Sequence, residues 1–348
     1  MPKPPYAVVD ADGHVHERDA DIREHLPEPY ASMEWVKTHS FFPSLDGWPR
    51  AITSPGRRDD PDAGIWLRFL DECGLERTYL YPTAGLAHGL IQDRKWAVAI
   101  AQGYNDWLHT RFMQRDPRLI GVALLPVQNI EAAVQELRRC VTELHMPAAV
   151  LPAATVLGKA FGHADFHPIY AEAERLNCPI AIHGAPSKGW GFDFFDTFIK
   201  VHTLEHPAAI FTQLTDMMFS GVFELFPKLR VAYLECGCGW VPWLMDRLDE
   251  EYERRGQRDA PLLRRAPSEY LRGGNIYVSC EVEERALPFA IEMMGEDQVF
   301  FASDYPHERA HDEYLDDIPE FLERHDLSDS AKRKIMRDNA IRFYAAAR

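Results

Sequence analysis

The regular alternation of short apolar runs with helical segments limits the fold of this chain more than any other feature. Runs rich in β-branched and aromatic residues are each followed by a segment with helical periodicity, and the connections are long enough for parallel crossovers. Eight such units in 348 residues predict an α/β protein, a (β/α)8 barrel of the TIM type. A Gly-x-Gly-x-x-Gly turn follows none of the runs, which disfavours an open sheet that binds a dinucleotide.

The predicted elements follow one another without an internal repeat beyond this alternation. Strands are expected within 7–17 and at 77–81, 119–125, 148–151, 179–183, 229–235, 275–281 and 298–304. Helices are expected at 65–73, 95–114, 130–144, 166–176, 206–226, 240–255, 284–294 and 328–346. A chain of this length fits one barrel domain over 1–348.

One long irregular segment, 18–64, interrupts the alternation directly after the first strand. Prolines break any long periodic element in it: Pro27, Pro29, Pro43, Pro49, Pro55 and Pro61. A connection of this length inside a compact domain is more often functional than an idle linker. The segment 18–64 is therefore predicted to be a lid or cap insertion.

Composition narrows the choice of partners and compartment. There are 38 Lys and Arg against 54 Asp and Glu, a net charge of −16, which disfavours nucleic acid and anionic membranes as partners. No apolar run is long enough for a transmembrane helix, and the first residues lack the apolar core of a signal peptide. The six cysteines are scattered through apolar segments. They are expected to be reduced, which favours the cytoplasm.

Polar residues stand at the ends of several predicted strands, where the catalytic groups of a barrel gather. Asp12 and His14 end the first strand, His183 the fifth, Glu235 the sixth and Asp304 the eighth. Because Asp12 and His14 are two residues apart, they point to the same face of a strand. Burying such groups alone is costly, so they must be paired or bound. We therefore expect them to form one site.

The residue types in this constellation suit a metal ion. Zinc and similar ions bind imidazole nitrogen and carboxylate oxygen, and a catalytic site keeps one position open for water or substrate. Asp12, His14, His183 and Asp304 would supply two imidazoles and two carboxylates. No lysine stands at the end of the strand at 148–151 to bridge two ions. One divalent ion is therefore expected, with zinc preferred and manganese as the alternative.

The sequence around these residues resembles the amidohydrolase superfamily. More narrowly, it resembles the branch that includes aminocarboxymuconate-semialdehyde decarboxylase and γ-resorcylate-type decarboxylases. The similarity covers essentially the whole chain and lies in Asp12-x-His14, His183, the stretch 221–231 followed by Glu235 and Gly239-Trp240, and Ser303-Asp304-Tyr305-Pro306-His307. This resemblance implies that Asp12, His14, His183 and Asp304 are the metal ligands.

The same resemblance sets expectations for proton transfer. Relatives often carry a catalytic histidine where this chain has Glu235, so the resemblance leaves the identity of the acid/base group open. Asp304, Glu235 and His206 are the predicted catalytic residues, and Glu235 would either move a proton or orient a ligand histidine. His206 opens a helix where a histidine often faces the pocket in this branch. His16 and His307 are further candidates.

Three functions are compatible with these residues. The preferred one is metal-dependent decarboxylation of a small aromatic or ring-cleaved carboxylic acid, since the local motifs resemble that branch. The alternative is hydrolysis of a C–N, C–O or C–C bond in a small carboxylated substrate by metal-activated water. A barrel that binds without catalysis is the third. The expected partner is the small carboxylate itself, and a homodimer is considered because dimers are common in that branch.

Overall fold

The protein forms a ring of parallel strands in a computed structural model, which describes residues 5–43, 62–185, 189–307 and 309–345. The strands are β1 (Val8–Val15), β2 (Leu75–Pro82), β3 (Leu119–Gly121), β4 (Ala123–Leu124), β5 (Ala149–Pro152), β6 (Ile180–His183), β7 (Val231–Leu234), β8 (Ile276–Cys280) and β9 (Val299–Phe301). Every pairing among these strands is parallel. Because β3 and β4 together occupy the strand expected at 119–125, the nine observed strands correspond to the eight predicted ones.

Backbone hydrogen bonds connect the two runs of paired strands into one ring. The pairing order is β1-β2-β3 and then β4 through β9, and only Val122 separates β3 from β4. The ring closes between its first and last strands. Asp304 N donates to Asp12 O at 3.0 Å, and His14 N donates to the carbonyl of Tyr305 at 2.8 Å. These two bonds bring the end of β1 beside the loop that follows β9, although about 290 residues separate them in sequence.

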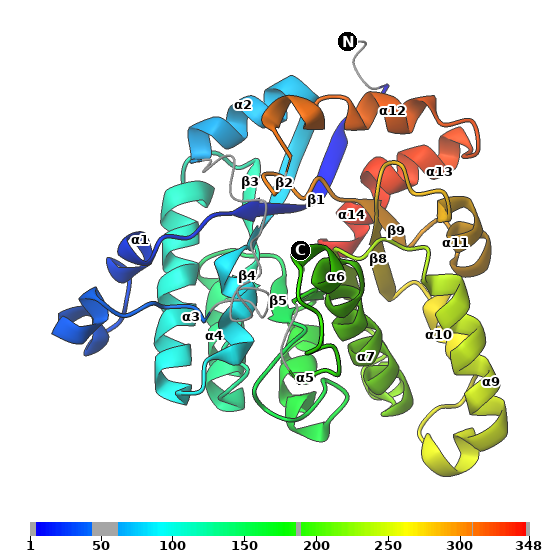
Figure 1. Ribbon diagram of the computed structural model, residues 1–348, viewed down its shortest axis with the longest axis horizontal. Coiled ribbons are helices and arrows are strands. Elements are labelled where there is room, and N and C mark those ends of the chain that lie inside the picture. Colours follow the sequence, from blue (N-terminus) through cyan, green and yellow to red (C-terminus); the bar gives the residue numbers. More distant parts are fainter. Residues whose placement is uncertain (1–4, 44–61, 186–188, 308, 346–348) are drawn as a thin grey trace.

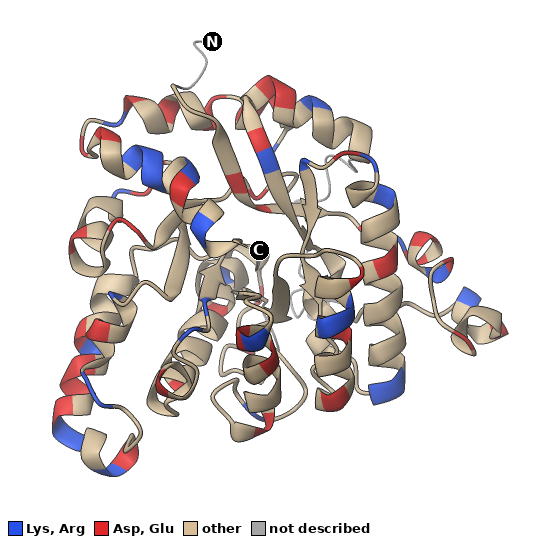
Figure 2. Cartoon of the chain, turned by 180° about the vertical axis from the view of Figure 1, so that it is seen from behind, with Lys and Arg blue, Asp and Glu red and all other residues tan. Residues whose placement is uncertain are grey.

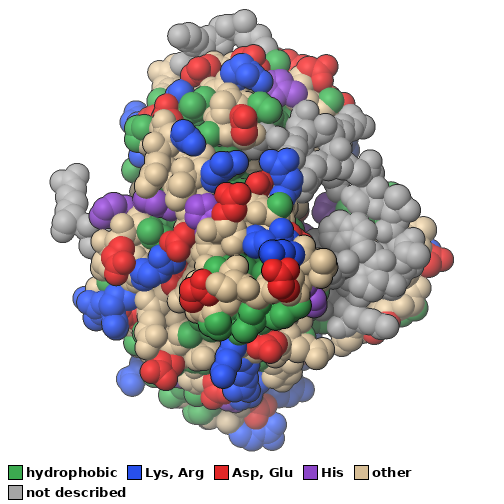
Figure 3. Space-filling view, turned by 90° about the vertical axis from the view of Figure 1, so that its left-hand side faces the viewer, with side chains coloured by type: hydrophobic (Ala, Val, Ile, Leu, Met, Phe, Trp, Pro, Cys, Tyr) green, Lys and Arg blue, Asp and Glu red, His purple; other side chains and the backbone are tan. Residues whose placement is uncertain are grey.

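Helices surround this ring, as Figure 1 shows. They are α1 (Asp19–Arg23), α2 (Ala63–Cys73), α3 (Arg94–Leu108), α4 (Ile130–Thr142), α5 (His167–Arg175), α6 (Phe198–Lys200), α7 (His206–Phe219), α8 (Val222–Leu225), α9 (Val241–Asp259), α10 (Pro267–Leu271), α11 (Leu287–Met294), α12 (Asp317–Glu323), α13 (Asp329–Arg333) and α14 (Asn339–Phe343). Acidic and basic residues lie mainly on these outer helices (Figure 2). On the face drawn in Figure 3, charges of both signs are interspersed.

Some helix boundaries differ from the sequence expectation. Instead of one helix over 206–226, Gly221 with φ 76° separates α7 from α8. Glycine adopts this left-handed backbone at little cost, so the helix ends there. The expected helices at 95–114 and 328–346 each contain a π-helical turn, at His109–Met113 and Lys334–Asp338. Residue 346 lies outside the described residues. The sequence analysis did not predict α1, α6, α10 and α12, and α1 lies in the segment that it expected to be irregular.

The described part of the predicted lid packs on the outside of the barrel. Tyr30, Trp35 and Phe41 lie around Trp96 of α3, with ring centroids 5.1–5.2 Å from it. Such aromatic contacts bury large apolar surfaces. Residues 44–61 of the predicted lid lie outside the described residues, and its function as a lid stays a prediction.

The polar strand β1 is the part of the core that positions the site. Parallel barrel strands are buried on both faces and are therefore usually apolar. All eight residues of β1 are buried, yet they include Asp10, Asp12 and His14.

Within the described residues, no helix is long and apolar enough to span a bilayer.

Candidate metal centre

The four predicted ligands converge where the strands end. Asp12 and His14 lie on β1, His183 ends β6, and Asp304 follows β9. His14 Nε2 lies 3.5 Å from both Asp12 Oδ1 and Asp304 Oδ1. His183 Nε2 lies 3.4 Å from Asp12 Oδ2. Ligand atoms placed about 2.0–2.2 Å from a tetrahedral zinc ion are separated by roughly 3.3–3.6 Å, so these three distances suit a metal ion. Among the described residues, two sets of atoms that all lie within 4.8 Å of one another share His14: Asp12, His14 and His183, and His14, Glu235, Asp304 and His307.

Backbone carbonyls fix the orientation of both histidine rings. His14 Nδ1 is 2.9 Å from the carbonyl oxygen of Pro82, and His183 Nδ1 is 3.0 Å from that of Gly184. Because a carbonyl only accepts, each Nδ1 carries the proton and donates it. In a neutral ring, the lone pair of Nε2 then faces the other ligands. Histidines that bind metals are commonly held by such a contact.

Several polar atoms at this point make no hydrogen bond of regular geometry with the described residues. They are Asp12 Oδ1, His14 Nε2, His183 Nε2, Glu235 Oε2 and Asp304 Oδ1. A buried polar group without a hydrogen bond costs about 1–3 kcal/mol. His183 Nε2 and Glu235 Oε2 form an ion pair at 3.0 Å, and Asp304 Oδ1 forms one with His307 at 2.7 Å, whereas Asp12 Oδ1 and His14 Nε2 lie 3.5 Å apart. A divalent cation would satisfy all of them, because its ligands are imidazole nitrogens and carboxylate oxygens. The donor set therefore fits a metal ion.

Glu235 brings a further carboxylate to the same point, although the sequence predicts it as a catalytic residue and not as a ligand. Its Oε2 lies 3.0 Å from His183 Nε2, and its side chain is 13% exposed. Glu235 and Asp304 both have left-handed backbone, with φ 60° and 52°. Residues other than glycine seldom adopt this conformation, and it persists where the surrounding structure enforces it. Here it occurs at two of the strand ends that carry carboxylates.

Electrostatics in this cluster favour a cation between the carboxylates. Burial raises the pKa of Asp12 to about 7, against the attraction of His183. Burial alone would lower the pKa of His183, but Asp12 and Glu235 outweigh it and hold that pKa well above its usual value. Burial, together with His307 and His183, holds the pKa of His14 well below the usual value. His14 is therefore neutral, as a metal ligand must be.

A buried carboxylate that the sequence reading missed holds the two ligand-bearing segments together. Asp10 Oδ2 accepts from the hydroxyl groups of Thr78 at 2.6 Å and Ser303 at 2.9 Å. Its Oδ1 accepts from the backbone N–H of Ser303 at 2.8 Å and of Asp12 at 3.3 Å. The bonds to Ser303 fix the residue directly before Asp304. The sequence does carry a signal for Asp10, because it is an acidic residue inside an apolar run, two positions before Asp12.

His206 contacts the backbone of Glu235 and lies further from its carboxylate. Its Nε2 is 3.0 Å from the carbonyl oxygen of Glu235 and 4.0 Å from Oε1. A Cβ on Gly184 would meet this Nε2 at 2.0 Å, so only glycine leaves room for the ring. His202, which the sequence reading missed, lies one helical turn earlier, with Nε2 3.9 Å from Glu235 Oε1. Because the carbonyl requires a proton on His206 Nε2, we assign no second metal ion to His202, His206 and Glu235.

The two remaining candidate histidines lie on the side of Asp304. His307 Nδ1 is 2.7 Å from Asp304 Oδ1, and its ring lies 4.1 Å from that of His14. His16 stacks on the outer side of His307, with ring centroids 5.9 Å apart. The structure therefore places His307 against a predicted ligand and His16 one ring further away.

A hollow of about 470 Å³ lies beside this cluster and reaches Glu235. Its size is within the range of sites for small ligands. Its lining residues are His202, Thr203, His206, Pro207, Glu235, Cys236, Gly237, Glu281, Glu283 and Glu284. Two of the predicted catalytic residues, His206 and Glu235, therefore face a space that a substrate could occupy.

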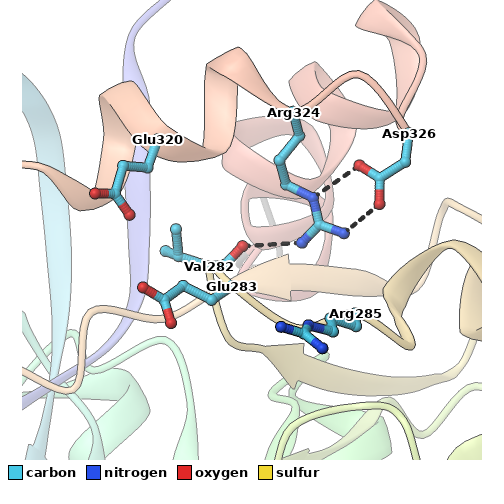
Figure 4. Close-up of a pocket in the computed structure, with 6 residues that line it drawn as sticks. All are labelled: Val282, Glu283, Arg285, Glu320, Arg324 and Asp326. Atoms are coloured by element: carbon cyan, nitrogen blue, oxygen red, sulfur yellow. Dashed lines mark hydrogen bonds and ion pairs between the residues drawn. The ribbon is translucent and has the colours of Figure 1, made fainter.

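A smaller hollow of about 340 Å³ adjoins the first at Glu283 (Figure 4). One of the two arginines that line it, Arg324, is already engaged. The guanidinium donates to Asp326 at 2.7 and 3.0 Å and to the carbonyl of Val282 at 2.9 Å. We assign no site to this second hollow.

Fold and site together define an enzyme built on a (β/α)8 barrel with a candidate metal centre. The sequence pattern of the amidohydrolase family matches residues 9–346. This chain belongs to the amidohydrolase family.

Two similar proteins of known function are decarboxylases, whereas a more distant relative is a 2-keto-4-carboxy-3-hexenedioate hydratase of Sphingobium sp.. The chain is 29% identical to 2-amino-3-carboxymuconate-6-semialdehyde decarboxylase of Dictyostelium discoideum over 288 residues, 82% of this chain and 76% of that protein. It is 27% identical to γ-resorcylate decarboxylase of Rhizobium radiobacter over 290 residues, 80% of this chain and 85% of that protein. The predicted family branch and the predicted class of enzyme, a decarboxylase, are therefore confirmed.

A solved structure with the same fold contains a metal ion. Dihydroxybenzoic acid decarboxylase of Polaromonas sp. JS666, with bound manganese and the inhibitor 2-nitroresorcinol, superimposes with a TM-score of 0.74. The two chains are 21% identical, and the match covers 97% of this chain and 96% of that one. The predicted barrel is confirmed by this likeness. The prediction of a metal centre agrees with the donor cluster, whereas the choice of zinc stays a prediction.

Proposed function

We propose that this protein is a metal-dependent decarboxylase of a small aromatic or ring-cleaved carboxylic acid. The observation that carries the proposal is the cluster of ligand atoms without regular hydrogen bonds, next to a hollow of about 470 Å³. Relatives with decarboxylase activity support the choice of reaction over hydrolysis. The proposed substrate is a small carboxylate.

Asp12, His14, His183 and Asp304 are the residues that would hold the metal ion in this proposal. A divalent ion held there would supply positive charge to orient and neutralise the substrate carboxylate. We propose zinc, because two imidazoles and two carboxylates suit it. Manganese is the alternative, since carboxylate oxygens suit this harder ion and the Polaromonas enzyme contains it.

Asp304 is the proposed proton donor. Its side chain is 37% exposed, far more than that of Asp12 at 1%, so it has access to substrate and solvent. The carbon that bears the substrate carboxylate accepts the proton from Asp304. The bond from this carbon to the carboxylate then breaks, its electron pair returns to the substrate, and carbon dioxide leaves. Asp304 regains a proton from water.

Glu235 and His206 have supporting functions in this scheme. Glu235 faces the hollow and touches His183, so we propose that it orients this ligand and sets the charge beside the substrate. His206 holds the backbone carbonyl of Glu235 and is proposed as a positioning residue for it.

The reaction itself can be tested by following carbon dioxide. We expect the metal-loaded protein to release it from at least one member of a panel of hydroxybenzoates and muconate semialdehydes, in equal amount to the acid consumed. Metal-stripped protein is the control and should release none. Turnover of lactones or esters without carbon dioxide would instead establish the hydrolase alternative.

Metal removal should abolish activity and lower stability. Chelation leaves the buried carboxylates without a cation, and returning zinc or manganese at 1,000 times its dissociation constant should stabilise the fold by about 4 kcal/mol. Thermal unfolding with and without added metal measures this effect. The His14→Ala/His183→Ala variant lacks both ligand nitrogens and should show no metal-dependent shift. If the purified protein holds no metal and gains no stability from it, the barrel that binds without catalysis is favoured.

The assembly and compartment are also proposals. Trp243 of α9 and Phe289 of α11 are 60% and 53% exposed on helices that pack together, which supports a homodimer through this face. Light scattering distinguishes the dimer from a monomer. All six cysteines are free, which supports a reducing compartment such as the cytoplasm.

A further inference from the structure

A chain of close polar contacts connects the Asp304 carboxylate to the loop that follows β2. Asp304 Oδ1 lies 2.7 Å from Nδ1 of His307. On the other side of the same ring, His307 Nε2 lies 2.9 Å from Oγ1 of Thr83. Thr83 directly follows β2, whereas Asp304 follows β9, so the chain crosses from one strand end of the barrel to another.

The loop that carries Thr83 is itself fixed by a buried carboxylate. Glu17 is 6% exposed and accepts hydrogen bonds from three consecutive backbone N–H groups. Thr83 N and Ala84 N donate to its Oε2 at 3.1 and 3.0 Å, and Gly85 N donates to its Oε1 at 2.9 Å. Charge-assisted bonds of this kind are stronger than those between neutral groups. Glu17 thus determines where the Thr83 hydroxyl lies.

The His307 ring has little freedom apart from these contacts. Its side chain is 15% exposed, and one face packs on the His14 ring at 4.1 Å. The backbone is held as well, since His307 N donates to Asp304 O at 2.9 Å and the hydroxyl of Tyr314 donates to His307 O. The freedom that remains is rotation of the imidazole about its Cβ–Cγ bond. The Thr83 hydroxyl restricts it, because a hydroxyl can donate or accept and so bonds the ring nitrogen in either state.

We propose that Thr83, placed by Glu17, is a positioning residue that acts through His307 to hold the Asp304 carboxylate at the metal centre. The inference rests on the proposed function, because it takes Asp304 as a ligand and proton donor. Without this contact, rotation of the His307 ring would leave Asp304 Oδ1 free to turn away from His14 and His183. Groups that orient metal ligands commonly change metal affinity or activity by 10–100-fold when they are lost.

Metal affinity of conservative threonine variants tests the proposal. We expect Thr83→Val, which keeps the side-chain shape but removes the hydroxyl, to weaken zinc or manganese binding about 10-fold in chelator competition. Thr83→Ser restores the hydroxyl and should return the affinity to within about 3-fold of wild type. Thr142→Val is the matched control, because the Thr142 hydroxyl donates to the carbonyl of Arg138 on an exposed face of α4. It should leave the affinity unchanged.

A double-mutant cycle shows whether the effect passes through His307. His307→Asn retains a short donor near Asp304 but cannot reach Thr83, so adding Thr83→Val to it should have no further effect. Additive losses would overturn the proposal, as would wild-type metal affinity of Thr83→Val. Should Thr83→Val fail to fold by circular dichroism, Glu17→Gln gives the same test, since it disturbs the loop without altering Thr83.

Kinetics separate this inference from the proposed reaction. With an active substrate, Thr83→Val should lower kcat about 10-fold and change KM by less than 3-fold, because the hydroxyl acts on Asp304 and not on the hollow. A protein that releases no carbon dioxide from any acid refutes the proposed reaction. The metal-binding cycle would still decide the role of Thr83.

Discussion

Asparagine in place of Asp304 should lower turnover by about 10³-fold and leave the fold intact. The variant removes a negative charge from the metal centre and a group that can carry a proton, while its size is unchanged. General acid–base groups contribute about 10²–10⁴-fold, and loss of a metal ligand adds to this. Carbon dioxide release under saturating metal measures the effect. Because Asp304 is partly exposed, stability should change little.

The matched control for this prediction is Asp312→Asn, which makes the same change of charge on an exposed carboxylate in the helical turn His311–Tyr314. It should retain wild-type turnover. If Asp304→Asn with a full complement of metal keeps more than a tenth of the activity, Asp304 is not the proton donor. Glu235, which faces the hollow, would then be the next residue to test.

The rule that barrel sites lie at strand ends made most of the metal centre predictable. Asp12 and His14 share one face of β1, and His183 and Asp304 each end or follow an apolar run, so the pattern alone brings them together. The order of strands and helices was also predictable, because most strands are apolar runs and the longer helices have helical periodicity. Breaks such as Gly221 were not, since a backbone conformation leaves no trace in periodicity.

The groups that support the ligands could not be predicted, because their partners are distant in sequence. Asp10 reaches Thr78 and Ser303, which are 68 and 293 residues away. Thr83 and His307 are 224 residues apart. His202 lies within an ordinary helical stretch and approaches Glu235 only through the fold. In each case the residue type is common at surfaces, and only the packing of different strand ends gives it a function.

The charges around the hollow bear on how an acidic protein could bind an acidic substrate. The net charge of −16 repels anions at long range, and Glu235, Glu281, Glu283 and Glu284 line the hollow. Glu284 is held by hydrogen bonds, because the backbone N–H groups of Cys238 and Gly239 donate to it. The other carboxylates lower the local potential, so a substrate carboxylate needs a cation that outweighs them. This is a second, independent reason to expect a divalent ion at the cluster.

Alanine at Asp10 should destabilise the fold by about 3–5 kcal/mol even without metal. The Asp10 side chain is fully buried and accepts hydrogen bonds from four donors, on Thr78, Ser303 and Asp12. Its removal leaves these donors unpaired and creates a cavity at the seam between β1 and β9. Urea unfolding of metal-free protein measures the change and excludes an indirect effect through lost metal.

Asp259→Ala is the control for Asp10→Ala, because the Asp259 side chain is 51% exposed and forms its ion pair with neighbouring Arg258. Its effect should stay within about 0.5 kcal/mol, as for most surface ion pairs. A loss below 1 kcal/mol for Asp10→Ala would mean that water or a shift of β1 replaces the carboxylate. The expected larger loss would show that the seam carrying Asp12 and Asp304 depends on one buried acid. The metal centre would then be built on a junction that exists before any ion binds.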